Sequence, residues 1–304
     1  MAALAAQDEA MFDPVARIAA FMDGFSIEAT RPSDADVAAL ATLKRGARVY
    51  LSAVPNRPAH ESLGAAILVR AAGFEPVPHV AVRNFAGIAA LDDFLARLNG
   101  EAGVTHVLVI AGDRAECGPL RRALDAIDGG ALRRRGIRTI GIAGYPEGHP
   151  RIGEVELNRA LGEKIAAAEA TGLTVEIVTQ FNAGAILDFL ARLRAFGFEH
   201  SVRVGLAGPT GLAPLLRYAA RCGVRTSAQA LVQRSGLLRQ MFAMTTPDDL
   251  VRALAEAAPA GVTPHFFSFG GVRATARWAR AVAGGSIALR ADGGFLVQAP
   301  KSEV

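Results

Sequence analysis

The sequence has little cysteine. Its two cysteines, Cys117 and Cys222, are too few for a disulfide scaffold in a chain of 304 residues. Their spacing does not form a metal-ligand pair, and no cluster of cysteine, histidine and aspartate supports a metal centre. We therefore interpret both cysteines as ordinary thiols and expect no metal.

Long apolar runs and a strong excess of one charge are also missing. The longest apolar runs, such as Val107–Ala111, are far shorter than the ~20 residues that cross a bilayer. The N-terminus lacks a basic region followed by an apolar stretch, so we expect a soluble, cytoplasmic protein without membrane contact. The net charge is only +4 and the arginines are dispersed over helix faces, which argues against nucleic acid as a partner.

Several catalytic motifs are absent. The chain has no Gly-x-Ser-x-Gly, no phosphate-binding loop of the P-loop type and no lysine at a predicted strand end. These absences argue against acyl transfer, nucleotide hydrolysis and Schiff-base aldol chemistry. The first predicted strand is followed by Arg31-Pro32-Ser33-Asp34 instead of a glycine-rich turn, which disfavours a doubly wound dinucleotide-binding sheet.

What the sequence does contain is an alternation of short apolar runs with helical stretches. Eight strand-helix units in roughly 250 residues predict a (β/α)8 TIM barrel, an α/β fold whose active sites lie at the carboxyl ends of the strands. We expect one domain over 1–304, with the barrel over 24–284, an N-terminal helix over 13–22 that plugs the barrel's amino end, and an extended or poorly ordered tail over 285–304. The predicted strands are Phe25–Thr30, Arg48–Val54, Pro76–Arg83, His106–Gly112, Arg138–Gly144, Val175–Phe181, Val202–Pro209 and His265–Gly271.

Polar residues at the predicted strand ends should converge on one mouth of this barrel. The densest group is the loop Gly141–Pro150, which carries Tyr145, Glu147 and His149 on a turn rich in glycine and proline. The full set is Glu28, Ser52, His79, Arg83, Asp113, Tyr145, Glu147, His149, Gln180, Asn182 and Ser268.

Three of these side chains suggest chemistry. Glu28 lies in an otherwise apolar strand, so we expect desolvation to raise its pKa and make it a general acid, unless it pairs with an arginine such as Arg83 or Arg31. Asp113 follows Gly112, which allows close backbone approach to a ligand; its alternative role is to cap the next helix. The amide of Gln180 donates and accepts, as a nitrogen-rich ring requires, although it also suits backbone groups at the rim.

The order of these motifs resembles the methylenetetrahydrofolate reductase family over about residues 25–270. That family is a flavin-dependent (β/α)8 barrel that reduces 5,10-methylenetetrahydrofolate to 5-methyltetrahydrofolate. The string from Gly144 to Pro150 is the most specific part. The motifs that carry the resemblance are Ser26-Ile27-Glu28, Pro78-His79, Ala111-Gly112-Asp113, Ala143-Gly144-Tyr145-Pro146-Glu147-Gly148-His149-Pro150 and Thr179-Gln180-Phe181.

The resemblance implies roles for individual residues. Glu28 would be the acid that protonates N10 of the folate, Asp113 would stabilise the cationic iminium form of the substrate, and Gln180 would contact the pterin. FAD would be held by Ser52, His79, Gly112, Asp113, Tyr145, His149 and Lys164, the last of these as a phosphate ligand on the following helix.

The chain also departs from the family's pattern. Ala111 stands where the family has an arginine that contacts the flavin, Asn182-Ala183-Gly184 replace an aromatic pair and an aspartate, and Ser268-Phe269-Gly270-Gly271 replace Thr-Leu-Asn-Arg. The last two sites line the face that nicotinamide and folate use in turn, so we expect FAD and a folate substrate but poor use of NADH. Two alternatives stay open: a flavin-free folate-dependent methyl-transfer barrel, and a folate- or flavin-binding subunit that needs a redox partner or forms a homo-oligomer.

Overall fold

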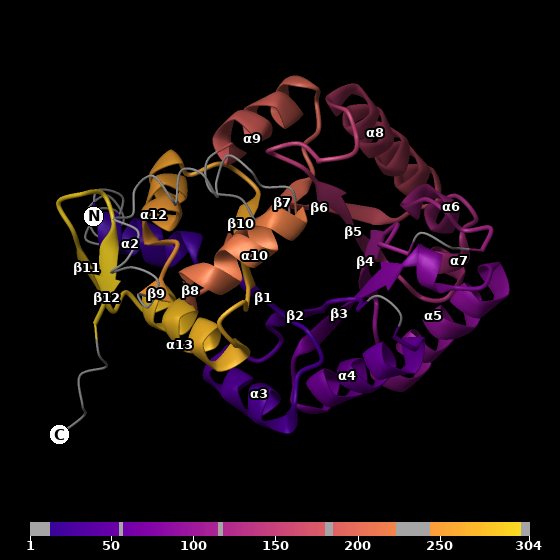
Figure 1. The fold of residues 1–304 in the computed structure, drawn as a ribbon, viewed down its shortest axis with the longest axis horizontal. Helices are drawn as coiled ribbons and strands as arrows, with labels where there is room; N and C mark the ends of the chain where they lie inside the picture. Colours follow the sequence, from indigo (N-terminus) through magenta and orange to yellow (C-terminus); the bar gives the residue numbers. More distant parts are fainter. Residues whose placement is uncertain (1–12, 55–56, 115–117, 180–184, 223–243, 299–304) are drawn as a thin grey trace, which may run out of the picture.

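The computed structural model describes residues 13–54, 57–114, 118–179, 185–222 and 244–298. Eight parallel strands close into a barrel, and helices surround it (Figure 1). The predicted (β/α)8 TIM barrel is thereby confirmed. In order around the barrel the strands are β1 (Ser26–Ala29), β10 (Val262–Phe267), β7 (Ser201–Ala207), β6 (Thr174–Thr179), β5 (Thr139–Gly144), β4 (His106–Ile110), β3 (Glu75–Ala81) and β2 (Arg48–Leu51).

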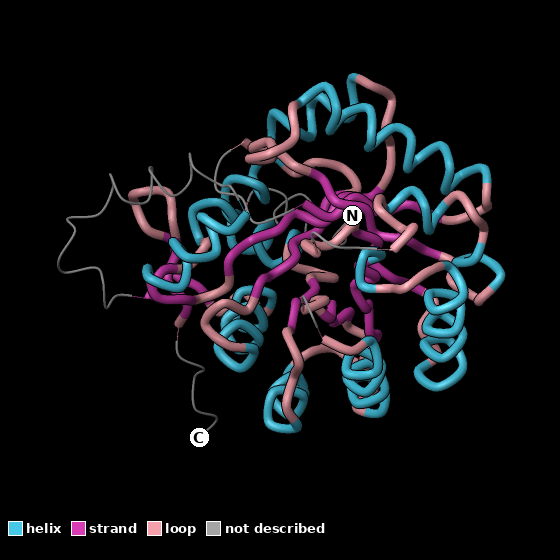
Figure 2. Tube along the Cα trace, turned by 45° about the vertical axis from the view of Figure 1, so that its right-hand side comes forward, coloured by secondary structure: helices cyan, strands magenta, loops and turns pink. Residues whose placement is uncertain are grey.

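The helices that follow the strands form the outer ring, drawn in cyan around the magenta strands in Figure 2. Their apolar faces and the outward side chains of the strands share one large core, because each strand turns alternate residues toward the helices. The helices are α3 (Asp34–Ala39), α4 (Ala59–Ala71), α5 (Ile88–Ala102), α6 (Ala123–Ile127), α7 (Ala131–Arg134), α8 (Glu154–Ala170), α9 (Ile186–Ala195), α10 (Leu212–Cys222), α12 (Asp248–Ala257) and α13 (Val272–Ala283), with short 3-10 turns η1 (Leu40–Thr42) and η2 (Val82–Asn84).

Inside the barrel, an apolar layer separates the two ends. Tyr50, Val77, Leu108 and Val178 are buried there and form a cluster distinct from the outer core. The carboxyl ends of the strands lie on one side of this layer and their amino ends on the other. We call these two ends the mouth and the base.

The eighth strand begins earlier than expected. The predicted strand His265–Gly271 is β10, Val262–Phe267, and residues 268–271 form the turn that leads into α13. Pro264 lies in the middle of β10, where a proline normally argues against a strand. The other seven predicted strands agree with the structure to within three residues at each end.

The N-terminal helix α2 (Pro14–Phe21) is present, with the Asp13 side chain capping it. It packs mainly against α12 and α13, and Arg17 donates to the carbonyl oxygens of Ala255 and Glu256 at the end of α12. The expected plug of the barrel is therefore wrong in position. The helix forms part of the outer layer because its apolar face finds α12 and α13.

The C-terminal segment also differs from the extended or poorly ordered tail that we expected. Strands β11 (Ile287–Leu289) and β12 (Phe295–Val297) pair as an antiparallel hairpin, and β12 lies against α12 and α13 (Figure 1). Phe295 is buried, stacks on Trp278 at 6.0 Å between ring centroids, and donates its N–H to Asp248. This apolar anchor fixes the segment. None of the helices in the described part of the chain has the length and hydrophobicity that a membrane span requires.

Candidate functional site at the barrel mouth

Glu28 lies at the centre of the mouth. Strand β1 alternates strictly: Ile27 and Ala29 are fully buried toward the helices, so Ser26 and Glu28 face the barrel interior. The Glu28 side chain keeps 14% of its surface exposed. It is therefore mostly desolvated yet reachable from the mouth.

Three side chains from three other strands converge on the Glu28 carboxylate. Ser52, just after β2, donates to Oε1 at 2.6 Å. His265 Nε2 of β10 lies 3.3 Å from Oε2 and His79 Nε2 of β3 lies 3.4 Å from the same oxygen. Sequence analysis placed Glu28, Ser52 and His79 at the mouth, and the structure brings these three together. Neither Arg31 nor Arg83 pairs with Glu28; Arg83 donates to the backbone oxygens of Arg121 and Gly112.

The electrostatics of Glu28 correct our expectation. Burial raises the pKa of Glu28, but the electrostatic attraction of His79 and the hydrogen bond from His265 outweigh burial and hold the pKa well below its usual range. Glu28 is therefore an ionised carboxylate at neutral pH and not a stored acid. The sequence argument considered only the apolar neighbours within β1, whereas the two imidazoles come from β3 and β10.

A hydrogen-bonded chain behind Glu28 fixes the state of His265. Arg203 Nη1 donates to Ser26 Oγ at 3.1 Å, and Ser26 Oγ lies 2.9 Å from His265 Nδ1. Because the arginine is always protonated, the serine accepts from it, and its own proton is directed to Nδ1. We therefore assign the proton of His265 to Nε2, which donates to Glu28. Burial lowers the pKa of His265, consistent with a neutral ring.

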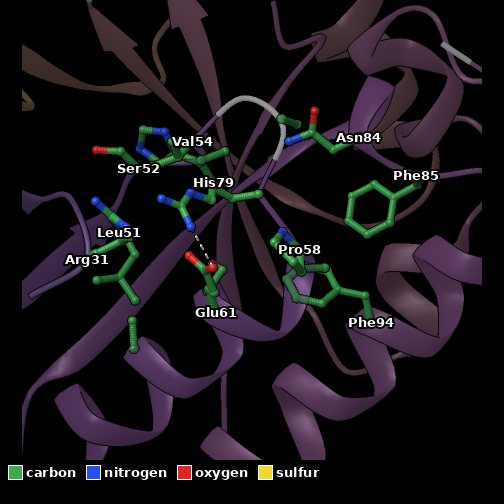
Figure 3. Close-up of a pocket in the computed structure, with 16 residues that line it drawn as sticks. Arg31, Leu51, Ser52, Val54, Pro58, Glu61, His79, Asn84, Phe85 and Phe94 are labelled. Carbon is green, nitrogen blue, oxygen red and sulfur yellow. Dashed lines mark hydrogen bonds and ion pairs between the residues drawn. The ribbon is translucent and has the colours of Figure 1, made fainter. Parts of the chain in front are cut away.

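A cavity opens beside this cluster between β2, β3, α4 and α5. Figure 3 shows Ser52 and His79 on one side of the cavity and Phe85 and Phe94 on the other. His79 Nε2 is buried and has no well-aligned hydrogen bond among the described residues. Arg31 also lines the cavity, so a ligand there would meet both a cation and a buried imidazole.

The loops after β4 and β5 form another part of the mouth. Tyr145 and His149 lie edge to face with ring centroids 5.4 Å apart. Burial lowers the pKa of His149, while the charge of Asp113 acts to raise it. The exposed Asp113 therefore lies near the loop that carries His149. The next described helix after β4 is α6, and its N-cap is Arg122, so Asp113 does not cap it. Gly112 adopts φ +89°, a conformation that favours glycine.

Next to this loop, a second cavity of about 280 Å³ extends from Tyr145 to Asn158 and Leu161 of α8. Lys164, the expected phosphate ligand, lies one turn beyond Leu161 and does not line this cavity. Burial lowers its pKa to about 8. Among the described residues, Lys164 has no ion-pair partner, so an approaching anion would raise its pKa again.

The turn after β10 explains why residue 270 is a glycine. A Cβ at Gly270 would lie 2.1 Å from the carbonyl oxygen of Pro209, so the turn after β10 packs directly on the backbone after β7. No side chain fits there. Phe267 and Phe269 instead stack at 5.5 Å with an interplanar angle of 13°, next to His265. An aromatic surface therefore remains at this part of the mouth.

Some predicted residues lie outside the described part of the chain, namely Gln180, Asn182–Gly184 and Cys117. Within the part that is described, no group of three histidine, cysteine, aspartate or glutamate side chains could hold a metal ion. His265 and Arg203 were missed by sequence reasoning. In a strand that begins at Val262, alternation places His265 inside the barrel. The predicted strand began only at His265, so this alternation was not visible.

No model of a known protein family matches the sequence. Among solved structures, the dihydropteroate synthase of Thermus thermophilus aligns with a TM-score of 0.47 and 16% identity, over 84% of this chain and 90% of that chain. The 3-dehydroquinate dehydratase of Aquifex aeolicus aligns with a TM-score of 0.39 and 10% identity, over 65% of this chain and 86% of that chain. At these identities and scores, the function has to be argued from the site itself.

Proposed function

We propose that this protein is a flavin-dependent oxidoreductase of the methylenetetrahydrofolate reductase type, which interconverts 5,10-methylenetetrahydrofolate and 5-methyltetrahydrofolate. The observation that carries the proposal is the convergence of Ser52, His79 and His265 on the Glu28 carboxylate. The motif that resembles the family's flavin loop, Gly144–Pro150, lines the same mouth.

The residues at the mouth fit FAD as the cofactor. The buried Nε2 of His79 lies 3.4 Å from Glu28 but makes no well-aligned hydrogen bond, and Lys164 is a partly buried lysine without an ion-pair partner among the described residues. His79 would donate a hydrogen bond to the polar ring of FAD, and Lys164 would be the cation that binds its diphosphate. Ser52, Gly112, Asp113, Tyr145 and His149 would complete the binding surface. When bound, FAD supplies hydride transfer to and from the one-carbon unit of the folate.

The protein's own part in the reaction is to move one proton and to stabilise one positive charge. When the methyl group is oxidised, N5 of the folate becomes part of a cationic iminium, and N10 must lose a proton as it closes the five-membered ring. Glu28 is ionised and accepts that proton, while the carboxylate of Asp113 stabilises the cation. In the opposite direction the protonated Glu28 returns the proton to N10.

The ionised state of Glu28 favours the oxidative direction. In that direction Glu28 accepts the N10 proton after the methyl group is oxidised, and its lowered pKa keeps it in the accepting form at neutral pH. Ring opening instead needs Glu28 to be protonated, against the attraction of two imidazoles. We therefore propose that the protein consumes 5-methyltetrahydrofolate, as a demethylation pathway requires.

Anaerobic mixing of the oxidised protein with 5-methyltetrahydrofolate tests this proposal. We expect the purified protein to be yellow or to take up FAD stoichiometrically, and the visible flavin absorbance to bleach after mixing. Folate binding by a colourless protein that takes up no FAD would contradict the proposal and favour a flavin-free methyl-transfer barrel. Bleaching or turnover that requires a second protein would instead favour a partner-dependent subunit.

The role of Glu28 is tested by Glu28→Gln. We expect FAD to stay bound and dithionite to reduce it, while folate turnover falls roughly 10²-fold or more, the contribution of a positioned proton acceptor. The matched control is Glu101→Gln, which removes an exposed carboxylate that pairs with Arg97 on α5. A Glu28→Gln variant as fast as this control would show that Glu28 has a structural role.

A further inference from the structure

A second pocket lies at the base of the barrel, on the far side of the apolar layer from the mouth. It has a volume of about 390 Å³, within the range of ~300–1,000 Å³ for small-molecule sites. Its wall is formed by the segments before β1 and β2, by Arg203 at the base of the barrel interior, and by the end of α13. We call this cavity the basal pocket; its charged lining residues are Asp23, Lys44, Arg45, Arg48, Arg203 and Arg280.

The charges of the basal pocket are not balanced. Asp23 pairs with Lys44 at 2.5 Å. Arg48 and Arg203 share one carboxylate, Glu176, and each lies 2.9 Å from it. Arg45 and Arg280 have no ion pair among the described residues. Five cations therefore line one cavity with a single lining carboxylate, Asp23, and within the part of the chain that the structure describes the only other carboxylate paired with them is Glu176 in the barrel interior.

From this arrangement we propose that the basal pocket binds a small molecule with two or more negative charges, carried by phosphate or carboxylate groups. Four of its five cations are arginines, whose planar guanidinium groups bind both kinds of group in a bidentate manner. Such a ligand would neutralise Arg45 and Arg280 in the space that they line. The inference does not depend on the flavin or folate chemistry of the mouth.

The basal pocket also communicates with the mouth. Arg203 has only 7% of its side chain exposed, and it donates to Ser26, which contacts His265, the partner of Glu28. An anion that attracts Arg203 would weaken its hydrogen bond to Ser26. The basal pocket is therefore placed to regulate the mouth through a single chain of hydrogen bonds across the apolar layer.

Calorimetric titration of the purified protein, with any FAD it carries left in place, tests for this site. Inorganic pyrophosphate and citrate serve as probes at neutral pH and constant ionic strength, with sodium chloride as the blank. We expect saturable binding with one site per chain for at least one of the two probes, and their ratio of affinities identifies phosphate or carboxylate as the preferred group. No saturable binding of either probe would overturn the proposal.

Variants locate the site. Arg45→Gln and Arg280→Gln should each weaken binding about two- to five-fold, and the double variant about tenfold, as expected for exposed ion pairs. Arg277→Gln is the matched control, since it removes an exposed charge from the same helix, α13, without touching the pocket. Equal weakening by the control would show a non-specific charge effect. Weakening by Arg31→Gln at the mouth, with the double variant unchanged, would place the anion at the mouth. Either result overturns the proposal.

Discussion

Glu176 is the central carboxylate of the barrel interior, and Glu176→Gln removes its charge while nearly preserving its shape. In the native protein, Arg203 and Arg48 each lie 2.9 Å from it, and Tyr50 donates to it at 2.7 Å. The variant leaves Arg203, with 7% of its side chain exposed, without a countercharge. Removing one partner of a buried pair costs about 3–5 kcal/mol, so we expect the free energy of unfolding to fall by that amount.

Urea unfolding followed by circular dichroism measures this loss. With a denaturant dependence of about 3 kcal/mol per M, the unfolding midpoint should fall by about 1–1.7 M. The control is Glu156→Gln on α8, whose ion pair with Arg159 is half exposed and contributes less than about 1 kcal/mol. Equal midpoints for the two variants would refute the reasoning that the interior carboxylate holds the arginines in place.

The pH dependence of the same measurement gives a second check. Burial raises the pKa of Glu176, but the neighbouring cations, led by Arg203, outweigh it and lower the pKa overall. A lowered pKa means that the carboxylate stabilises the fold fully above the ordinary value of about 4.3, and that this contribution disappears as the pH falls through the folded-state pKa. The gap between the native protein and Glu176→Gln should therefore narrow below about pH 4.3 and stay constant above it.

Two further predictions concern the mouth. Gly270→Ala should lower the free energy of unfolding by about 1–3 kcal/mol, because its Cβ would lie 2.1 Å from the Pro209 carbonyl oxygen. The control Gly64→Ala, in open space on α4, should raise the free energy of unfolding by up to about 1 kcal/mol. Equal effects of the two substitutions in thermal unfolding would contradict this prediction. NADH and NADPH should reduce the flavin poorly compared with dithionite, with about 10²-fold weaker use than an intact nicotinamide face would give, despite the stacked pair Phe267 and Phe269. Fast stopped-flow reduction at micromolar NADH would disprove it.

The barrel could be predicted from the sequence because its evidence is local. Each strand is a short apolar run and each helix has its own periodicity, so eight repeats of the pattern predict the closed topology. The C-terminal hairpin was missed although Asp292-Gly293 is a typical hairpin turn, because strands of three residues carry almost no periodicity.

The candidate site was predictable only in part, because its chemistry depends on partners that are distant in the chain. The position of Glu28 at the mouth follows from β1 alone. Its ionised state depends on His265, which is 237 residues away, and on the exact start of β10. The proton on His265 depends in turn on Arg203, from a third strand. Spacing along one strand cannot reveal such a chain.

The pairing of β1 with both β2 and β10 affects how this protein is made in the cell. Strand β1 can pair with β2 soon after both leave the ribosome, but its other edge finds β10 only about 210 residues later. At about 5–20 residues per second, the nascent sheet keeps one edge open for roughly 10–40 s. Open edges of apolar strands pair with other chains. Newly made protein therefore exposes this edge to other chains until its last barrel strand emerges, and slower synthesis lengthens the exposure.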